Sequence, residues 1–218
     1  MARVTAVLHP EKPHLRGWSH AVAAVAAIAL CPVVIALSPG ARMAAAVFTT
    51  ATIGLFTTSA TYHRFRWGRR MHEVMKRLDH SMIFIAIAAT YTPIAAVALP
   101  SGPGSLILRI VWVGAAAGVL VKVLWPHAPR ALSVALYITV GWAALLVIDD
   151  IWVALGVGGF ALLMLGGVLH TVGAVVYATQ RPNPWPRWFG FHEIFHLFVI
   201  AAIATHYVVV ATIALPKA

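Results

Sequence analysis

The sequence predicts an all-α integral membrane protein, a bundle of seven transmembrane helices with a cytoplasmic N-terminus and an outer C-terminus. Three observations support this prediction: an apolar composition, seven apolar stretches of membrane-spanning length, and a one-sided distribution of lysine and arginine. Of the 218 residues, 61% are hydrophobic and 10% are charged, against about 45–50% apolar and about 25% charged in a soluble domain. This composition excludes a water-soluble enzyme, a disordered chain and a secreted disulfide scaffold.

The first four predicted spans follow a short cytoplasmic tail over 1–17. A transmembrane helix needs about 20 mostly apolar residues. Ser38-Pro39-Gly40 separates the first two such stretches, the polar segment 63–79 separates the second from the third, and a proline- and glycine-rich run follows the third. We place these spans at 18–38, 41–62, 80–99 and 105–125.

The last three spans complete a predicted transmembrane domain over 18–218. Pro126 and Pro129 precede the fifth span, and a loop rich in proline precedes the seventh. The fifth and sixth spans are separated only by Asp149-Asp150. We place these spans at 131–149, 151–178 and 192–215.

Lysine and arginine set the predicted orientation, because cytoplasmic loops of membrane proteins carry an excess of these residues. With the N-terminus inside, 13 of the 16 basic residues lie on the cytoplasmic side, and only Arg42, Arg109 and Lys217 lie outside. The formal net charge of +10 is then explained by topology and by contact with anionic lipid. The charge therefore does not call for a nucleic-acid partner, and we expect a multi-pass protein of the bacterial cytoplasmic (inner) membrane.

Ionisable residues at membrane depth are costly and are functional candidates by default. His192 and His196 lie four residues apart and share a helix face, as do Ser59 and His63 at the end of the second span. Asp79 and His80 are expected to open the third helix. In the predicted orientation, all three groups lie at the cytoplasmic end of the bundle.

This convergence predicts a Zn²⁺ site with His63, His192 and His196 as ligands. Three imidazoles around zinc leave a fourth position open to water, which is typical of catalytic sites. Zinc lowers the pKa of bound water and polarises a carbonyl. We expect Asp79 to hold that water or to act as general base, and Ser59 to hydrogen-bond the water or a substrate carbonyl.

Other readings of these residues remain open. A single membrane histidine more often makes a helix–helix hydrogen bond, which is the expectation for His20, His170 and His206, and Asp79 has basic neighbours with which to pair. A G-x-x-x-G at 114–118 marks either a dimer face or close packing inside the bundle.

The stretch 192–196 also matches H-E-x-x-H, the zinc-protease signature in which the glutamate is the base. Against proteolysis, the motif lies in the last span and no carboxylate follows it to serve as a third ligand. We expect Glu193 to point at lipid headgroups or at a basic residue such as Arg187.

Four motifs resemble the hemolysin III family, the bacterial branch of the progestin and adipoQ receptor superfamily. They are Ser59-Ala60-Thr61-Tyr62-His63, Arg77-Leu78-Asp79-His80-Ser81, Thr90-Tyr91-Thr92-Pro93, and Arg181-Pro182-Asn183-Pro184-Trp185-Pro186 leading into Phe191-His192-Glu193-Ile194-Phe195-His196. The resemblance implies seven helices with a cytoplasmic N-terminus. In the related adiponectin receptors three histidines hold zinc, and these match His63, His192 and His196; Asp79 and Ser59 match the neighbouring motif residues.

Those receptors and the alkaline ceramidases of the wider superfamily resemble zinc-dependent lipid amidases. The first functional hypothesis is therefore a zinc-dependent hydrolase that acts on an amide or ester of a membrane lipid. A non-enzymatic membrane-homeostasis or lipid-sensing protein with structural zinc is the second, and a lytic pore is the third. The sequence departs from the adiponectin receptors at Glu193, where they have glutamine, which argues against Glu193 as an obligatory base.

Overall fold

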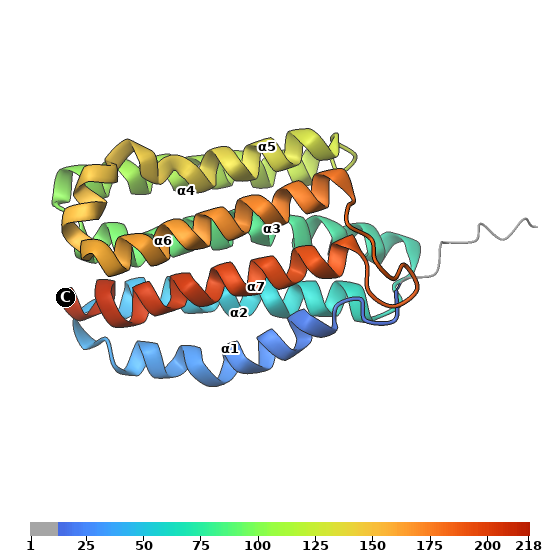
Figure 1. The fold of residues 1–218 in the computed structure, drawn as a ribbon, viewed down its shortest axis with the longest axis horizontal. Helices are drawn as coiled ribbons and strands as arrows, with labels where there is room; N and C mark the ends of the chain where they lie inside the picture. The colour runs from blue at the N-terminus through green and yellow to red at the C-terminus, as the bar shows by residue number, and fades with distance from the viewer. Residues whose placement is uncertain (1–12) are drawn as a thin grey trace, which may run out of the picture.

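The long helices run side by side along one axis in the computed structural model, which describes residues 13–218 (Figure 1). Only residues 13–17 of the predicted tail over 1–17 are therefore described. Within the described range there is no β-strand beyond an isolated bridge between Trp185 and Phe189. The α-helices are α1 (Trp18–Ala36), α2 (Arg42–Arg64), α3 (Arg69–Pro93), α4 (Ser101–Leu124), α5 (Arg130–Gly141), α6 (Ile148–Thr179) and α7 (Phe191–Val209). Short 3₁₀ or π segments cover Pro39–Ala41, Ile94–Ala98, Trp142–Val147, Val210–Ala214 and Leu215–Lys217.

The described residues contain six helical stretches that are long and apolar enough to cross a membrane. Large apolar side chains cover the outside of the bundle: Leu37, Met43 and Val153 are 77%, 79% and 82% exposed. A soluble monomer rarely leaves such a surface in water, whereas hydrocarbon is a good solvent for it. The chain is therefore a multi-pass helical membrane protein. The six stretches are Trp18–Ala36, Pro39–Arg64, Arg69–Ala98, Ser101–Leu124, Arg130–Thr179 and Phe191–Lys217.

The fifth stretch is 50 residues long and doubles back on itself. Figure 1 shows its gold segment running across the end of the bundle between α5 and α6. The boundary predicted at Asp149-Asp150 is wrong, because both residues lie in the first turn of α6 and the backbone leaves helical geometry at Gly156, where φ is 65°. Acidic residues favour the start of a helix through the helix dipole, and glycine adopts a positive φ without a steric penalty.

The polar segment 63–79, predicted to separate the second and third spans, is partly helical. Helix α3 begins at Arg69, so Asp79 and His80 lie inside the helix instead of opening it. The added turns are rich in arginine, methionine, glutamate, lysine and leucine, which are good helix formers. This extension places Asp79 in the interior of a continuous helix, which holds it on a rigid element.

Close helix packing explains the glycine pattern in α4. A Cβ on Gly118 would collide with the ring of Phe84 from α3. The G-x-x-x-G at 114–118 therefore packs within the chain, as one of the two predicted alternatives states. Phe84, Ile107 and Val111 are fully buried in the resulting core, and Cys31 is a buried free thiol.

The end of α2 and the start of α7 lie at the same end of the bundle as the described start of the chain, and the C-terminus lies at the other end (Figure 1). Helix α1 packs on α2, α2 on α3, and α6 on α7. This arrangement brings together residues that are 129 positions apart in the sequence.

Candidate metal centre

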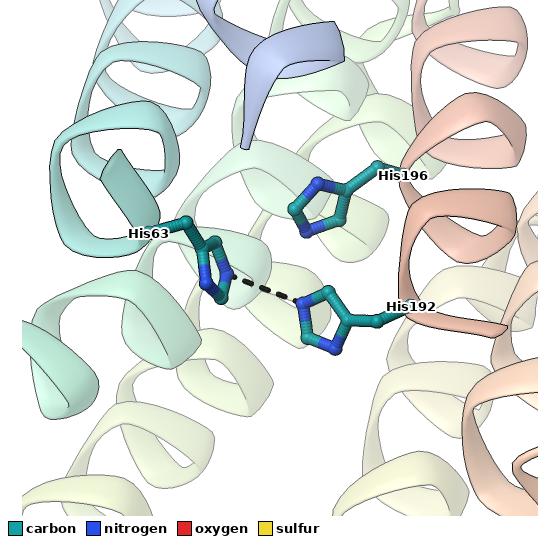
Figure 2. Close-up of side chains that lie close together, drawn as sticks. All are labelled: His63, His192 and His196. Atoms are coloured by element: carbon teal, nitrogen blue, oxygen red, sulfur yellow. Dashed lines mark hydrogen bonds between the residues drawn. The ribbon is translucent and has the colours of Figure 1, made fainter. Parts of the chain in front are cut away.

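Three histidines from two helices face one another at this end of the bundle. His63 is the second-last residue of α2, His192 is the second residue of α7, and His196 lies one turn further along α7. Figure 2 shows the three rings pointing into the space between the two helices. The sequence prediction that these side chains converge is confirmed by this geometry.

The spacing of the rings suits a metal ion. One nitrogen of each ring lies within 4.8 Å of the others, and the Nε2 atoms of His63 and His192 are 3.2 Å apart. Tetrahedral zinc with Zn–N bonds of 2.0–2.1 Å would hold its nitrogens about 3.4 Å apart, so modest side-chain adjustments bring the set to that geometry. His63 and His196 are buried, and His192 is half-buried.

Asp79 and Ser59 lie beside the histidines. The Asp79 Oδ2 atom is 3.9 Å from His63 Nε2 and 3.8 Å from His80 Nδ1. Ser59 lies one turn before His63 on α2, and its hydroxyl is 2.8 Å from the Nδ1 atom of His20. Both Ser59 and Asp79 are buried, and both line a small cavity with His192 and His196, which we call the polar cavity.

His20 is the residue of this site that sequence reasoning missed. The expected helix–helix hydrogen bond is present, because His20 of α1 pairs with Ser59 of α2. In addition, its ring stacks on that of His196 with centroids 3.8 Å apart and planes 7° apart. Its position as the third residue of the first helix, at the predicted cytoplasmic end, is the sequence signal that could have placed it at the site.

Glu193 is held by partners other than the three histidines. Its Oε2 atom accepts the backbone N–H of Gly190 at 2.8 Å, which caps the first turn of α7. Its Oε1 atom forms an ion pair with Arg16, and the side chain is 2% exposed. A basic partner was expected, but the partner is Arg16 and not Arg187. The carboxylate that a zinc protease would use as base is thus engaged elsewhere.

The segment over 13–17 lies against the loop that leads into α7. The backbone N–H groups of His14 and Leu15 donate to the carbonyls of Arg187 and Trp188 at 3.0 and 3.1 Å. Gly17 has a φ of 80°, and a Cβ there would lie 2.7 Å from the Cβ of His63. The start of the described chain therefore packs directly on a candidate metal ligand.

A larger apolar cavity adjoins the polar cavity. It lies among α3, α5, α6 and α7, and its walls are almost entirely apolar, as is usual for sites that bind small molecules. Its lining includes Ile87, Leu163, Ile203, His170 and His206. The two cavities share part of their walls, namely Leu55, Ile83, Tyr137, Ala174, Phe195 and Val199.

Together, the fold and the site define a helical multi-pass membrane protein with a candidate metal centre of three histidines. The family described as Haemolysin-III related matches residues 8–207, so the chain belongs to that family, as the sequence motifs indicate. Hemolysin-3 homolog of Bacillus subtilis (strain 168) is 30% identical over 158 residues, which cover 72% of this chain and 71% of that protein.

Two further relatives extend the similarity. Hemolysin-3 of Bacillus cereus is 29% identical over 205 residues, or 92% of this chain and 90% of that protein. Monocyte to macrophage differentiation factor of Homo sapiens is 25% identical over 170 residues, or 76% of this chain and 68% of that protein. The similarity therefore reaches from bacterial hemolysin-3 proteins to a human relative.

Proposed function

We propose that this protein is a zinc-dependent hydrolase of a lipid amide or ester. The observation that carries the proposal is the group of three histidine nitrogens within 4.8 Å of one another, beside a buried carboxylate and a buried hydroxyl. Three neutral imidazoles form a donor set that zinc prefers, with one position left for a small ligand. When bound, zinc would polarise a substrate carbonyl and acidify a water molecule.

Three residues of the chain would accept the proton, bind the substrate carbonyl and position a ligand. Asp79 accepts the proton of the attacking water, because its carboxylate lies on the polar cavity and 3.9 Å from His63. The Ser59 hydroxyl is oriented by its 2.8 Å contact with His20 and hydrogen-bonds the substrate carbonyl. His20 in turn keeps the His196 ring in place by stacking on it.

The apolar cavity supports a lipid as the substrate. It shares walls with the polar cavity, so a molecule with its scissile bond beside the histidines would extend its hydrocarbon part into apolar surroundings. Membrane lipids are available from the bilayer that surrounds the bundle. The site lies at one end of the helices, which suits attack near the headgroup level with water arriving from that side.

The topology completes the proposal. A helix of 50 residues would be about 75 Å long at 1.5 Å per residue, whereas the hydrocarbon core is about 30 Å thick, so the stretch Arg130–Thr179 crosses twice. The chain then crosses seven times, with the N-terminus cytoplasmic and the C-terminus outside. The histidine cluster lies at the cytoplasmic end of the bundle in the inner membrane.

One observation favours a second function, a lipid-state sensor with structural zinc. The ligands come from α2 and α7, so a metal ion there would tie together two helices that are distant in the sequence. Such a tie would stabilise the bundle without any turnover. The sensor hypothesis predicts zinc binding but no acyl release from lipids.

The decisive experiment compares Asp79→Asn with wild type on a panel of N-acyl and O-acyl lipids. Asp79→Asn should keep most of its zinc and lose hydrolysis, because the amide cannot accept the proton. Glu73→Gln makes the same chemical change on the same helix, outside the polar cavity, and should hydrolyse normally. Zinc-loaded wild type that releases no acyl group would instead support the sensor, and loss of all zinc from Asp79→Asn would make Asp79 a ligand.

A further inference from the structure

Most polar side chains around the apolar cavity already have partners. The Tyr91 hydroxyl donates to the carbonyl of Gly141 at 2.6 Å and accepts the N–H of Ala144 at 2.8 Å. Thr90 and Thr171 donate to backbone carbonyls of their own helices, each at 2.8 Å. These groups need nothing from a ligand. Two histidines in the lining, His170 of α6 and His206 of α7, are different.

His206 carries an unpaired acceptor. Its Nε2 atom is 3.3 Å from the carbonyl oxygen of Leu163, and a carbonyl only accepts hydrogen bonds, so Nε2 carries the proton. No carboxylate of residues 13–218 lines the cavity, so none of them favours a charged ring there. The neutral ring then leaves Nδ1 as an acceptor, and Nδ1 is buried without a partner among the described residues. Leaving such a group unpaired costs free energy.

The surroundings of His206 hold this ring firmly. A Cβ on Gly166 of α6 would collide with the Nε2 atom, so the glycine lets the ring reach the α6 backbone. The ring of His170 lies with its centroid 5.7 Å from that of His206. Both rings line the apolar cavity, so an oxygen atom of a molecule in the cavity that reaches the pair would accept from one ring and donate to Nδ1 of His206. A hydroxyl does both, whereas a ketone or carboxylate has no proton to donate.

We propose that His206 and His170 form a site for a hydroxyl group on the hydrocarbon part of a bound lipid. On α7 the site lies ten residues beyond His196, or about 15 Å at 1.5 Å per residue. The continuous wall shared by the two cavities favours a long molecule, so the ligand class is a hydroxylated acyl chain. Only the placement of its head beside the metal centre rests on the proposed function.

The test measures binding of three matched fatty acids to the purified protein in detergent: stearate with a mid-chain hydroxyl, stearate with a mid-chain keto group, and stearate itself. The hydroxylated acid should bind about threefold to tenfold more tightly than the other two, the range of one hydrogen bond. Equal affinity for all three acids in wild type would overturn the proposal. Binding of cholestanol is measured as well. Tighter binding of this sterol than of the hydroxylated acid would overturn the choice of an acyl chain.

Variants locate the effect. His206→Phe keeps an aromatic ring without nitrogen and should abolish the preference for the hydroxyl, whereas Met164→Leu changes an apolar residue of the same cavity and should retain it. Retained preference in a folded His206→Phe would overturn the assignment. His63→Ala should lose zinc and still favour the hydroxylated acid, which separates this site from the proposed hydrolase. If His206→Phe does not fold, the ligand comparison on wild type still decides.

Discussion

At the residue scale, His20 and Glu193 make contacts that their sequence neighbourhoods do not specify. Glu193 sits inside an H-E-x-x-H motif, but its carboxylate caps α7 and pairs with Arg16. His20 stands alone in the first helix, but its ring stacks on His196 and contacts Ser59. The motif around Glu193 therefore suggests a catalytic role that its contacts do not support. The sequence around His20 gives no sign of its contact with His196.

We expect Glu193→Gln to retain zinc and any lipid hydrolysis. The glutamine oxygen can still accept the Gly190 N–H, while the lost charge leaves Arg16 without its ion-pair partner. The unfolding free energy should fall by about 1–2 kcal/mol. Zinc analysis, a hydrolysis assay and thermal unfolding of the same preparation measure these effects. An inactive Glu193→Gln with an active Asp79→Asn would revive the protease hypothesis.

Each candidate ligand should be needed for zinc. His63→Ala, His192→Ala and His196→Ala each remove one of the three converging nitrogens, so each should lower zinc occupancy from about one ion per chain to a small fraction. His127→Ala removes an exposed histidine between α4 and α5 and is the matched control. Elemental analysis of purified protein provides the measurement. Full zinc in one of the three variants would remove that histidine from the ligand set.

At the element scale, the segment over 13–17 and the loop before α7 form one unit above the metal centre. The two are joined by backbone hydrogen bonds from His14 and Leu15 and by the tilted stacking of His14 on Trp188, with centroids 4.5 Å apart. The Arg16–Glu193 ion pair ties this unit to the start of α7. The unit therefore holds the helix ends that carry His63 and His192.

Gly17→Ala should disturb this unit. The backbone there has a φ of 80°, and the new Cβ would lie 2.7 Å from the Cβ of His63. We expect a loss of about 1–3 kcal/mol in unfolding free energy, since a left-handed conformation alone costs about 1–2 kcal/mol, and weaker zinc retention against a chelator. Gly68→Ala has open space around the new Cβ and an ordinary φ of −62°, so it should behave like wild type. Equal zinc retention in both variants would contradict the proposed contact.

At the scale of the whole molecule, the histidine site and a cluster of basic residues lie at the same end of the bundle. The start of the described chain and the basic run at the start of α3 also lie at the end with the histidines. Helix α3 begins with Arg69-Arg70, which suits contact with an anionic inner leaflet. The site and the basic loops are therefore expected on the cytoplasmic side.

Reporter fusions test this topology. A periplasm-active reporter fused after Ala218 should be active, because seven crossings from a cytoplasmic N-terminus put the C-terminus outside. The same reporter inserted within 66–74 should be inactive, because that segment lies at the end with the histidines. The reverse pattern would move the metal centre to the outer leaflet and remove the cytoplasmic water supply from the mechanism.

The sequence alone determined the membrane environment, most helix positions and the faces that carry the histidines. These features depend on local quantities: hydropathy over about 20 residues, the 3.6-residue period that aligns His192 with His196, and charge near helix ends. The break at Ser38-Pro39-Gly40 likewise acts locally, which is why α1 and α2 lie within two residues of the predicted spans, whereas α4 already begins at Ser101, inside the predicted break.

Only the tertiary structure decided which side chains meet. The turn at Gly156 depends on how α6 returns to pack on α7, and Asp149-Asp150 look like a loop because charges at a helix start resemble charges between helices. The partner of Glu193 is 177 residues away, and the stack of His20 on His196 joins the first helix to the last. Such contacts arise from the packing of whole helices, and the spacing of residues along one helix carries no information about them.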